Sequence, residues 1–339
     1  MQRIQYIDRL KGVAMLAVLV CHISDWILCQ KDSPIRLFCD SFQMPLFFML
    51  SGIVISEPPS LKKCGRKILS FWAPLFTVGM VYSYMREIKL SDYVCGSYKS
   101  GYWYLWVLGL FYFFISLFHY LQFKGKVRLL VDALGGAMIM LSVYLADRYT
   151  MPSCIGILSL NHLYHYWPYF FVGYLFRRYN VANNIEERRD WMASLALVAG
   201  MPLYYFLRMM RRYDDSGQII TLLNWTLGFC FILVFFHLFR NREQSGSIIE
   251  RGLAEIGKRS LDVYIFHYFF VTTRVMNLKY LGIWFASTGN WLLDAAFCTV
   301  LAVLISLLTM GVGYMVRHCQ GLNVIVYGKI PLQSLRESH

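Results

Sequence analysis

The chain has 339 residues, of which 57% are hydrophobic and only 16% are charged, and its formal net charge is +13. Soluble domains carry about 25% charged residues, so this composition excludes an ordinary soluble protein. In a chain this apolar, the positive charge is typical of basic loops that face anionic lipid, and we expect no nucleic-acid partner.

Long apolar runs without a charged residue recur along the chain. Residues 100–123, 216–239 and 295–316 contain no Asp, Glu, Lys or Arg, and each run exceeds the ~20 residues that a helix needs to cross a bilayer. The sequence therefore predicts an all-α protein, a polytopic membrane bundle with about ten transmembrane helices. In chain order, we place them at residues 11–29, 37–56, 68–85, 103–121, 128–146, 154–176, 191–208, 217–239, 260–277 and 291–316.

Only short loops connect these helices, so we expect the chemistry to take place among the helices themselves. We predict one membrane domain over residues 1–316 and a short cytoplasmic tail over residues 317–339. Of the 33 Lys and Arg residues, 22 lie on the side of the N-terminus and 11 on the opposite side. Because basic residues concentrate on the cytoplasmic side of a membrane protein, we expect both termini to lie in the cytoplasm, with the chain in the cell membrane among its lipids.

The first helix carries a histidine inside the membrane. Lys11 and His22 are separated by three helical turns plus about 20°, so both side chains lie on one face of the helix. Ionisable groups inside a membrane are costly and usually functional, which favours a site role for His22 over a structural hydrogen bond. Asp25, one turn further on, is placed either to orient the imidazole or to lie at the membrane interface. Lys11 fits a site cation and a positive-inside anchor equally well.

Two further segments allow a structural and a functional interpretation. Residues 41–52 form an apolar helix with a kink at Pro45 and a small Ser51–Gly52 surface for close packing. Residues 62–67 are basic and lead into the third helix. This basic run either anchors the chain to lipid headgroups or holds the phosphates of a ligand.

The nine cysteines show neither a CxxC pair nor the spacing of metal ligands, so we expect no metal site and no disulfide framework. Most are interpreted as small apolar packing residues. Pairing of Cys29 with Cys39 is left open. His162 and His165 fall near a loop and are assigned no chemistry.

Five motifs, in order from residue 7 to residue 267, resemble the acyltransferase 3 family of membrane O-acyltransferases. The first is Ile7-Asp8-Arg9-Leu10-Lys11-Gly12-Val13-Ala14, with ten residues between Lys11 and His22. The others are Gln43-Met44-Pro45-Leu46-Phe47-Phe48 with Ser51-Gly52, Trp103-Tyr104-Leu105 with Phe111-Tyr112, Phe171-Val172-Gly173-Tyr174, and the run Gly257 to His267. Two positions depart from the family pattern. Lys11 replaces the usual Arg and lacks its bidentate fork, and Gln43, where His is common, cannot titrate.

The resemblance implies transfer of an acyl group, usually acetyl, from acetyl-CoA or another acyl-CoA to a hydroxyl of a cell-surface glycan or glycolipid. It implies that His22 is the general base and that cytoplasmic basic residues bind the donor. By position, the donor-binding residues are Lys11, Lys63, Arg66 and Lys67. Asp25 is expected to assist His22, and Ser51, Tyr264 and His267 are expected to support the site. Acyl-CoA acts as a co-substrate, so we expect no bound cofactor.

Two other functions compete with this one. A multi-span transporter or exporter of a polar or acylated metabolite also uses intramembrane ionisable residues, but it favours repeated halves, and residues 1–150 do not match residues 151–316. A lipid-linked glycosyltransferase commonly presents acidic residues in the first outer loop, whereas Asp25, Asp32 and Asp40 are dispersed. Assembly into a homo-oligomer is left open.

Overall fold

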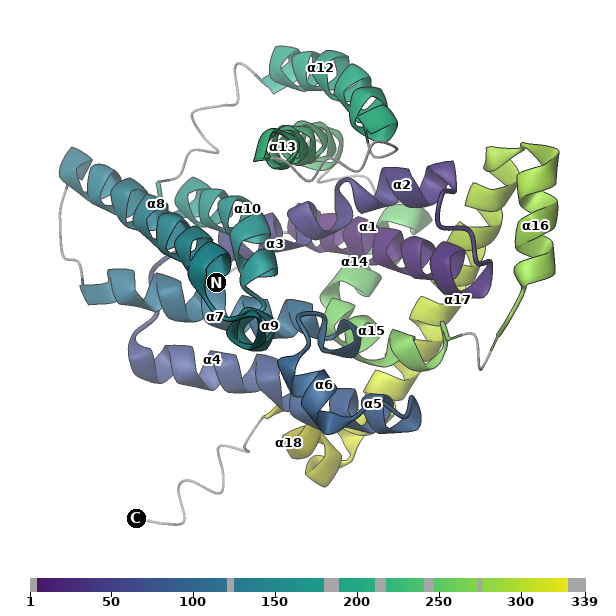
Figure 1. Cartoon of the computed structure of the whole chain (residues 1–339), viewed down its shortest axis with the longest axis horizontal. Helices are drawn as coiled ribbons and strands as arrows, with labels where there is room; N and C mark the ends of the chain where they lie inside the picture. Colours follow the sequence, from purple (N-terminus) through teal and green to yellow (C-terminus); the bar gives the residue numbers. More distant parts are fainter. Residues whose placement is uncertain are drawn as a thin grey trace. The chain divides into compact units, whose positions relative to one another are not determined.

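The computed structural model describes residues 5–120, 125–179, 189–210, 218–240, 247–272 and 276–328 (Figure 1). Every regular element within these ranges is a helix, which confirms the all-α prediction. The chain divides into two compact units, residues 1–54 with 169–310, and residues 55–168 with 311–339. We describe each unit separately.

The first unit is built around α1 (Gln5–His22), in which 13 of the 18 residues are buried. Helix α1 packs most extensively against α14 and also contacts α2, α3, α13 and α15 (Figure 1). The other elements of this unit are a π-helical turn η1 (Ile23–Ile27), α2 (Pro34–Asp40), α3 (Gln43–Ile53), the second half of α10 (Leu160–Arg178), α12 (Arg189–Met210), α13 (Gln218–Arg240), α14 (Ile248–Lys258), α15 (Ser260–Phe266), η7 (His267–Phe269), α16 (Lys279–Thr288) and most of α17 (Trp291–His318).

The second unit pairs α4 with α7 and includes the end of the chain. The predicted tail begins with a helix, α18, which packs against α4 and buries Val326 and Tyr327. The elements of this unit are α4 (Leu61–Pro74), η2 (Leu75–Gly79), α5 (Met80–Met85), α6 (Leu90–Cys95), η3 (Lys99–Gly101), α7 (Trp103–Leu117), η4 (Phe118–Tyr120), α8 (Gly125–Tyr149), α9 (Pro152–Leu158), the first half of α10, the end of α17 and α18 (Gln320–Tyr327).

Six helices, not about ten, are long and apolar enough to cross a membrane within the described residues. All six coincide with predicted helices, and the second begins before the predicted residue 68 because the basic run 62–67 is itself helical. The six are Gln5–Ile27, Leu61–Met85, Trp103–Tyr120, Val127–Tyr149, Ile219–Phe239 and Trp291–His318.

The predicted count was wrong because the other four segments are broken or short. The segment 37–56 is split at Phe42 into α2 and α3, and 154–176 is split at Ser159, whose φ of 53° ends α9 in the left-handed conformation. In the described part of the segment 260–277, the α-helix ends at Phe266 and a 3-10 turn follows, while residues 273–275 lie outside the described residues. The segment 191–208 forms a shorter apolar helix within α12. Hydropathy averaged over a window does not detect such breaks, since they come from single backbone angles.

Glycines allow the helices of the first unit to approach closely. A Cβ at Gly52 of α3 would meet the backbone of Phe170 in α10, and a Cβ at Gly173 would meet the backbone of Met49. Small residues at such crossings are the usual means by which membrane helices bring their backbones together. The packing role predicted for the Ser51–Gly52 surface therefore agrees with the α3–α10 contact.

A buried lysine holds the loop before α7 in the second unit. The Lys99 ammonium donates hydrogen bonds to the carbonyls of Val94 (2.8 Å), Gly96 (3.2 Å) and Gly156 (3.4 Å), and the side chain lies over the Trp106 ring. Burial lowers the Lys99 pKa to about 8. The three backbone carbonyls thus stabilise the positive charge of Lys99 in a partly desolvated environment.

Candidate active site

The site is built on a close contact between α1 and α14. A Cβ at Gly12 would overlap the Leu253 carbonyl, and a Cβ at Gly257 would overlap the Asp8 carbonyl and lie 2.9 Å from the Gly12 amide nitrogen. The two helices therefore cross at this pair of glycines. At Arg259, with a φ of −108° and a ψ of 16°, α14 ends and α15 begins. His267 directly follows α15, and its ring stacks on that of His22.

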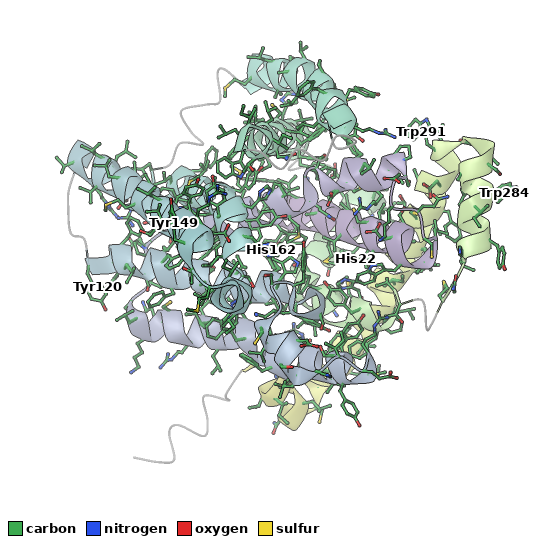
Figure 2. All side chains as sticks on the ribbon, viewed as in Figure 1. His22, Tyr120, Tyr149, His162, Trp284 and Trp291 are labelled. Atoms are coloured by element: carbon green, nitrogen blue, oxygen red, sulfur yellow. The ribbon has the colours of Figure 1, made fainter. Side chains whose placement is uncertain are left out.

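His22 ends α1, at the point where the helix widens into the π-helical turn. Its half-buried ring, labelled in Figure 2, stacks on Trp26 with ring centroids 4.4 Å apart and planes inclined by 21°. It also stacks on His267, at 5.3 Å and 18°. The structure thus brings together two histidines that the sequence assigned to the site from opposite ends of the chain.

The hydrogen bonds of His267 fix its tautomer. Its Nδ1 lies 2.8 Å from the Tyr264 carbonyl and 3.1 Å from the Val263 carbonyl. A carbonyl oxygen only accepts, so Nδ1 carries the proton and Nε2 presents a lone pair. The ring is fully buried, and Nε2 has no hydrogen-bond partner among the described residues. The Nε2 of His267 is therefore an available hydrogen-bond acceptor in the ring that stacks on His22.

Tyrosines complete the surroundings of the histidine pair. Tyr264, predicted as a supporting residue, is buried with its ring centroid 5.8 Å from that of His267. Tyr268 lies 3.9 Å from His267 and 5.6 Å from His22. Trp26 and Tyr268 were not selected from the sequence. Trp26 lies four residues after His22, and Tyr268 directly follows His267. These spacings were the signal in the sequence that could have identified them, because aromatic residues next to a buried histidine pack against its ring.

Asp25, for which the sequence left open either orienting His22 or lying at the membrane interface, pairs with Arg36. Its carboxylate is ion-paired with the Arg36 guanidinium, with 2.8 Å between Oδ1 and Nε. The π-helical turn over Ile23–Ile27 changes the register after His22, so the i, i+3 argument for an ideal helix does not apply. Burial lowers the Arg36 pKa, but attraction to Asp25 and Asp40 outweighs it and the pKa is raised.

The remaining predicted residues are distributed over both units. In the first unit, Lys11 is half-buried on α1, and Ser51 is buried in α3. In the second unit, Lys63, Arg66 and Lys67 are exposed on the first turns of α4. Lys67 also lies over the Phe71 ring, at 5.3 Å from its centroid. These three residues, called the α4 basic face below, form a cationic surface at one end of a candidate span.

No cluster of three or more His, Cys, Asp or Glu side chains in the described part of the chain could hold a metal ion. The side chains around the histidine pair supply imidazole and tyrosine groups, with the Asp25–Arg36 ion pair nearby. Such a set can accept and return a proton and can place a positive charge near a developing negative one.

The long apolar helices define the class of protein as a multi-pass membrane protein. The family model for an acyltransferase domain, acyltransferase 3, matches residues 4–311. The chain therefore belongs to the acyltransferase 3 family, as its five motifs predicted. Neither the curated proteins nor the solved structures include a significant match to this chain.

Proposed function

We propose that the protein is a membrane O-acyltransferase that moves an acyl group, most simply acetyl, from acyl-CoA to a hydroxyl of a cell-surface glycan or glycolipid. The donor is taken from the cytoplasm, on the side of both termini, and the acceptor lies at the outer leaflet of the cell membrane. Family membership supports the acyltransferase class. The stacked His22–His267 pair is the observation that carries the assignment of the reacting centre.

His22 acts as the general base in this proposal. A sugar hydroxyl is a weak nucleophile at neutral pH and needs a base within reach, a role that imidazole fills most often. His22 takes the hydroxyl proton as the oxygen attacks the thioester carbonyl. When the tetrahedral intermediate collapses, the C–S bond breaks, the acyl ester remains on the acceptor, and His22 returns the proton to the departing CoA thiolate.

His267 positions the reacting groups. Its Nδ1–H is committed to two backbone carbonyls, so the ring orientation is fixed. Its Nε2 is left to accept a hydrogen bond from an acceptor hydroxyl. Together with the rings of Trp26 and Tyr268, the His267 ring packs against the His22 imidazole and restricts its movement. Held in this way, the base loses little entropy when the substrate binds.

The α4 basic face and Lys11 bind the donor phosphates. Lys and Arg side chains hold phosphate through charge-assisted hydrogen bonds, and three cations on adjacent turns of one exposed helix face suit the several phosphates of CoA. Lys11 supplies charge but not the fork of an Arg. We therefore expect Lys11→Ala mainly to raise the donor KM and Lys11→Arg to retain most activity.

The general-base role is tested by turnover per folded molecule in detergent, with radiolabelled acetyl-CoA. His22→Ala should lower kcat by about 10²–10⁴-fold while donor binding survives. His22→Gln keeps hydrogen bonding but has no useful pKa, so it should be nearly as inactive. The exposed His318 supplies the control, since His318→Gln should turn over like the wild type. Substantial turnover by His22→Gln would end the general-base assignment.

The acceptor is identified by mass spectrometry of surface glycans from cells with and without the gene. The mass difference identifies the acyl group that is transferred, and the glycan that carries it limits the candidate acceptors. Use of acetyl-CoA by the purified protein, with label reaching a glycan, separates the enzyme from a transporter, which consumes no CoA ester.

A further inference from the structure

A guanidinium group lies beside the histidine pair and has no part in the reaction described above. Arg36 belongs to α2, which folds back against the end of α1. Its backbone carbonyl accepts a hydrogen bond of 3.3 Å from the Sγ of Cys21, the residue next to His22. Its side chain pairs with Asp25, three residues after His22.

The ion pair occupies only part of the guanidinium. The 2.8 Å contact with Asp25 is made through Nε, and no described residue hydrogen-bonds the two terminal nitrogens. The side chain keeps 22% of its accessible surface, so a substrate can reach it. A guanidinium is planar, so an ion pair made at Nε leaves its terminal N–H groups to another acceptor.

The loop that carries Arg36 toward His22 is anchored at several points. The Gln30 side chain donates to the Gly282 carbonyl of α16, and Ser33 donates to the Asp294 carboxylate of α17. The Leu278 amide donates to the Ile27 carbonyl at 2.9 Å. Donors stabilise developing charge best when they need no reorganisation at the moment of reaction. This loop provides that rigidity.

We propose that Arg36 is a catalytic residue whose terminal nitrogens bind the carbonyl oxygen of the acyl donor and stabilise the negative charge that this oxygen acquires in the tetrahedral intermediate. Asp25 is then a positioning residue that holds the guanidinium through Nε. The inference rests on the proposed acyl transfer and assigns the oxyanion partner within it. The proton still moves between the acceptor oxygen, His22 and the CoA sulfur, and Arg36 remains protonated throughout.

The test compares Arg36→Gln with Lys31→Gln, which removes the same charge from the exposed surface of the same loop. Loss of one oxyanion donor costs about 10²–10³-fold in kcat, so Arg36→Gln should show this loss at an unchanged donor KM, and Lys31→Gln should behave like the wild type. Arg36→Lys should be intermediate, because an ammonium cannot pair with Asp25 and bind the carbonyl in the same way. An alkyl-CoA thioether, which lacks the carbonyl oxygen, should inhibit the wild type and Arg36→Gln equally.

Removing Arg36 alone leaves Asp25 without its partner and risks misfolding. The double variant Asp25→Asn with Arg36→Gln removes both charges, so it should recover folded yield while its kcat stays low. Normal turnover per folded molecule in that variant would overturn the proposal. A raised donor KM at unchanged kcat would also overturn it, by assigning Arg36 to the CoA phosphates. If His22→Ala is inactive while Arg36→Gln is active, the oxyanion role of Arg36 is refuted and the general-base role of His22 stands. If His22→Ala is active, the general-base role of His22 is itself refuted.

Discussion

Arg9 of α1 and Glu250 of α14 form an ion pair at 3.5 Å in which the two side chains keep only 5% and 7% of their accessible surface. Breaking a buried pair from one side leaves an uncompensated charge and costs about 3–5 kcal/mol. We therefore expect Glu250→Gln to lower the thermal unfolding midpoint in detergent markedly.

The double variant Arg9→Met with Glu250→Leu provides the control for this pair. Replacing a buried ion pair by apolar residues of similar volume is often neutral or stabilising. Its midpoint should therefore lie close to that of the wild type. A single variant as stable as the wild type would show that the pair contributes little to holding α14 against α1.

Two glycines of α14 provide a matched test of the α1–α14 contact. A Cβ at Gly257 would overlap the backbone of Asp8, whereas a Cβ at Gly252 would meet nothing within 4 Å. Gly257→Ala should destabilise the protein by about 1–3 kcal/mol, as overpacking does. Gly252→Ala should stabilise the helix by roughly 0.5–1 kcal/mol. Equal effects on the unfolding midpoint would contradict the close contact between α1 and α14.

The α4 basic face predicts salt-sensitive donor binding. Replacing Arg66 and Lys67 together by Gln should raise the donor KM with little change in kcat. The difference from the wild type should shrink at high ionic strength, because salt screens exposed charges. Lys89→Gln is the control, since Lys89 is exposed just beyond the other end of the span Leu61–Met85. Unchanged donor affinity would show that the α4 basic face does not bind the donor and only anchors the chain to lipid headgroups.

Lys99 predicts a pH-dependent contribution to stability. Its pKa is about 8 in the folded protein, against 10.5 in the unfolded chain. Between these values the unfolded state binds more protons, so the free energy of unfolding gains a contribution that rises with pH. Above this range both states are neutral, and below it both are charged. The wild type should therefore gain stability over Lys99→Met as the pH rises from about 8 to about 10.

The control for Lys99 is Lys89→Met, at an exposed lysine of the same loop. Its unfolding midpoint should follow that of the wild type across the whole pH range. If Lys99→Met also runs parallel to the wild type, the ammonium is not held in a desolvated place.

The orientation of α8 follows from the charges at its ends. Lys124, Lys126 and Arg128 flank its start, and only Arg148 lies near its end. The positive-inside rule places the start in the cytoplasm. In a background without other accessible cysteines, Val127→Cys should be protected from an impermeant reagent added outside intact cells, and Tyr149→Cys should react.

The same labelling experiment shows whether a helix shorter than the six candidate spans also crosses the membrane. With a cytoplasmic N-terminus, the six candidate spans taken alone would put Val127 outside. Protection of Val127 therefore requires a further crossing before this residue. The longest connection available is residues 28–60, between the first and second candidate spans, where α2 and α3 lie. Reaction from outside would overturn the cytoplasmic assignment of that end of α8.

The sequence predicted the features that depend on long stretches of similar residues. Each of the six candidate spans contains a long, mostly apolar run, and two of the five family motifs, at residues 7–14 and 103–112, lie on these spans. It did not predict α14, whose charged residues looked like a loop, although Ser247-Ile248-Ile249-Glu250 has the S-x-x-E pattern that precedes many helices. The Asp25–Arg36 pair was missed because it depends on a π-helical turn and a reversal of the chain, neither of which leaves a periodic signal.

The shortness of α14 and α15 also has a consequence for biogenesis. Neither helix is long enough to insert as an independent span, so we expect both to be held in place by α1, which precedes them in the chain. His267 lies 245 residues after His22 in the chain, and their rings can meet only after nearly four fifths of the protein has been synthesised. Insertion therefore precedes assembly of the site, and a nascent chain that stops before α15 presents a lone histidine in the bilayer.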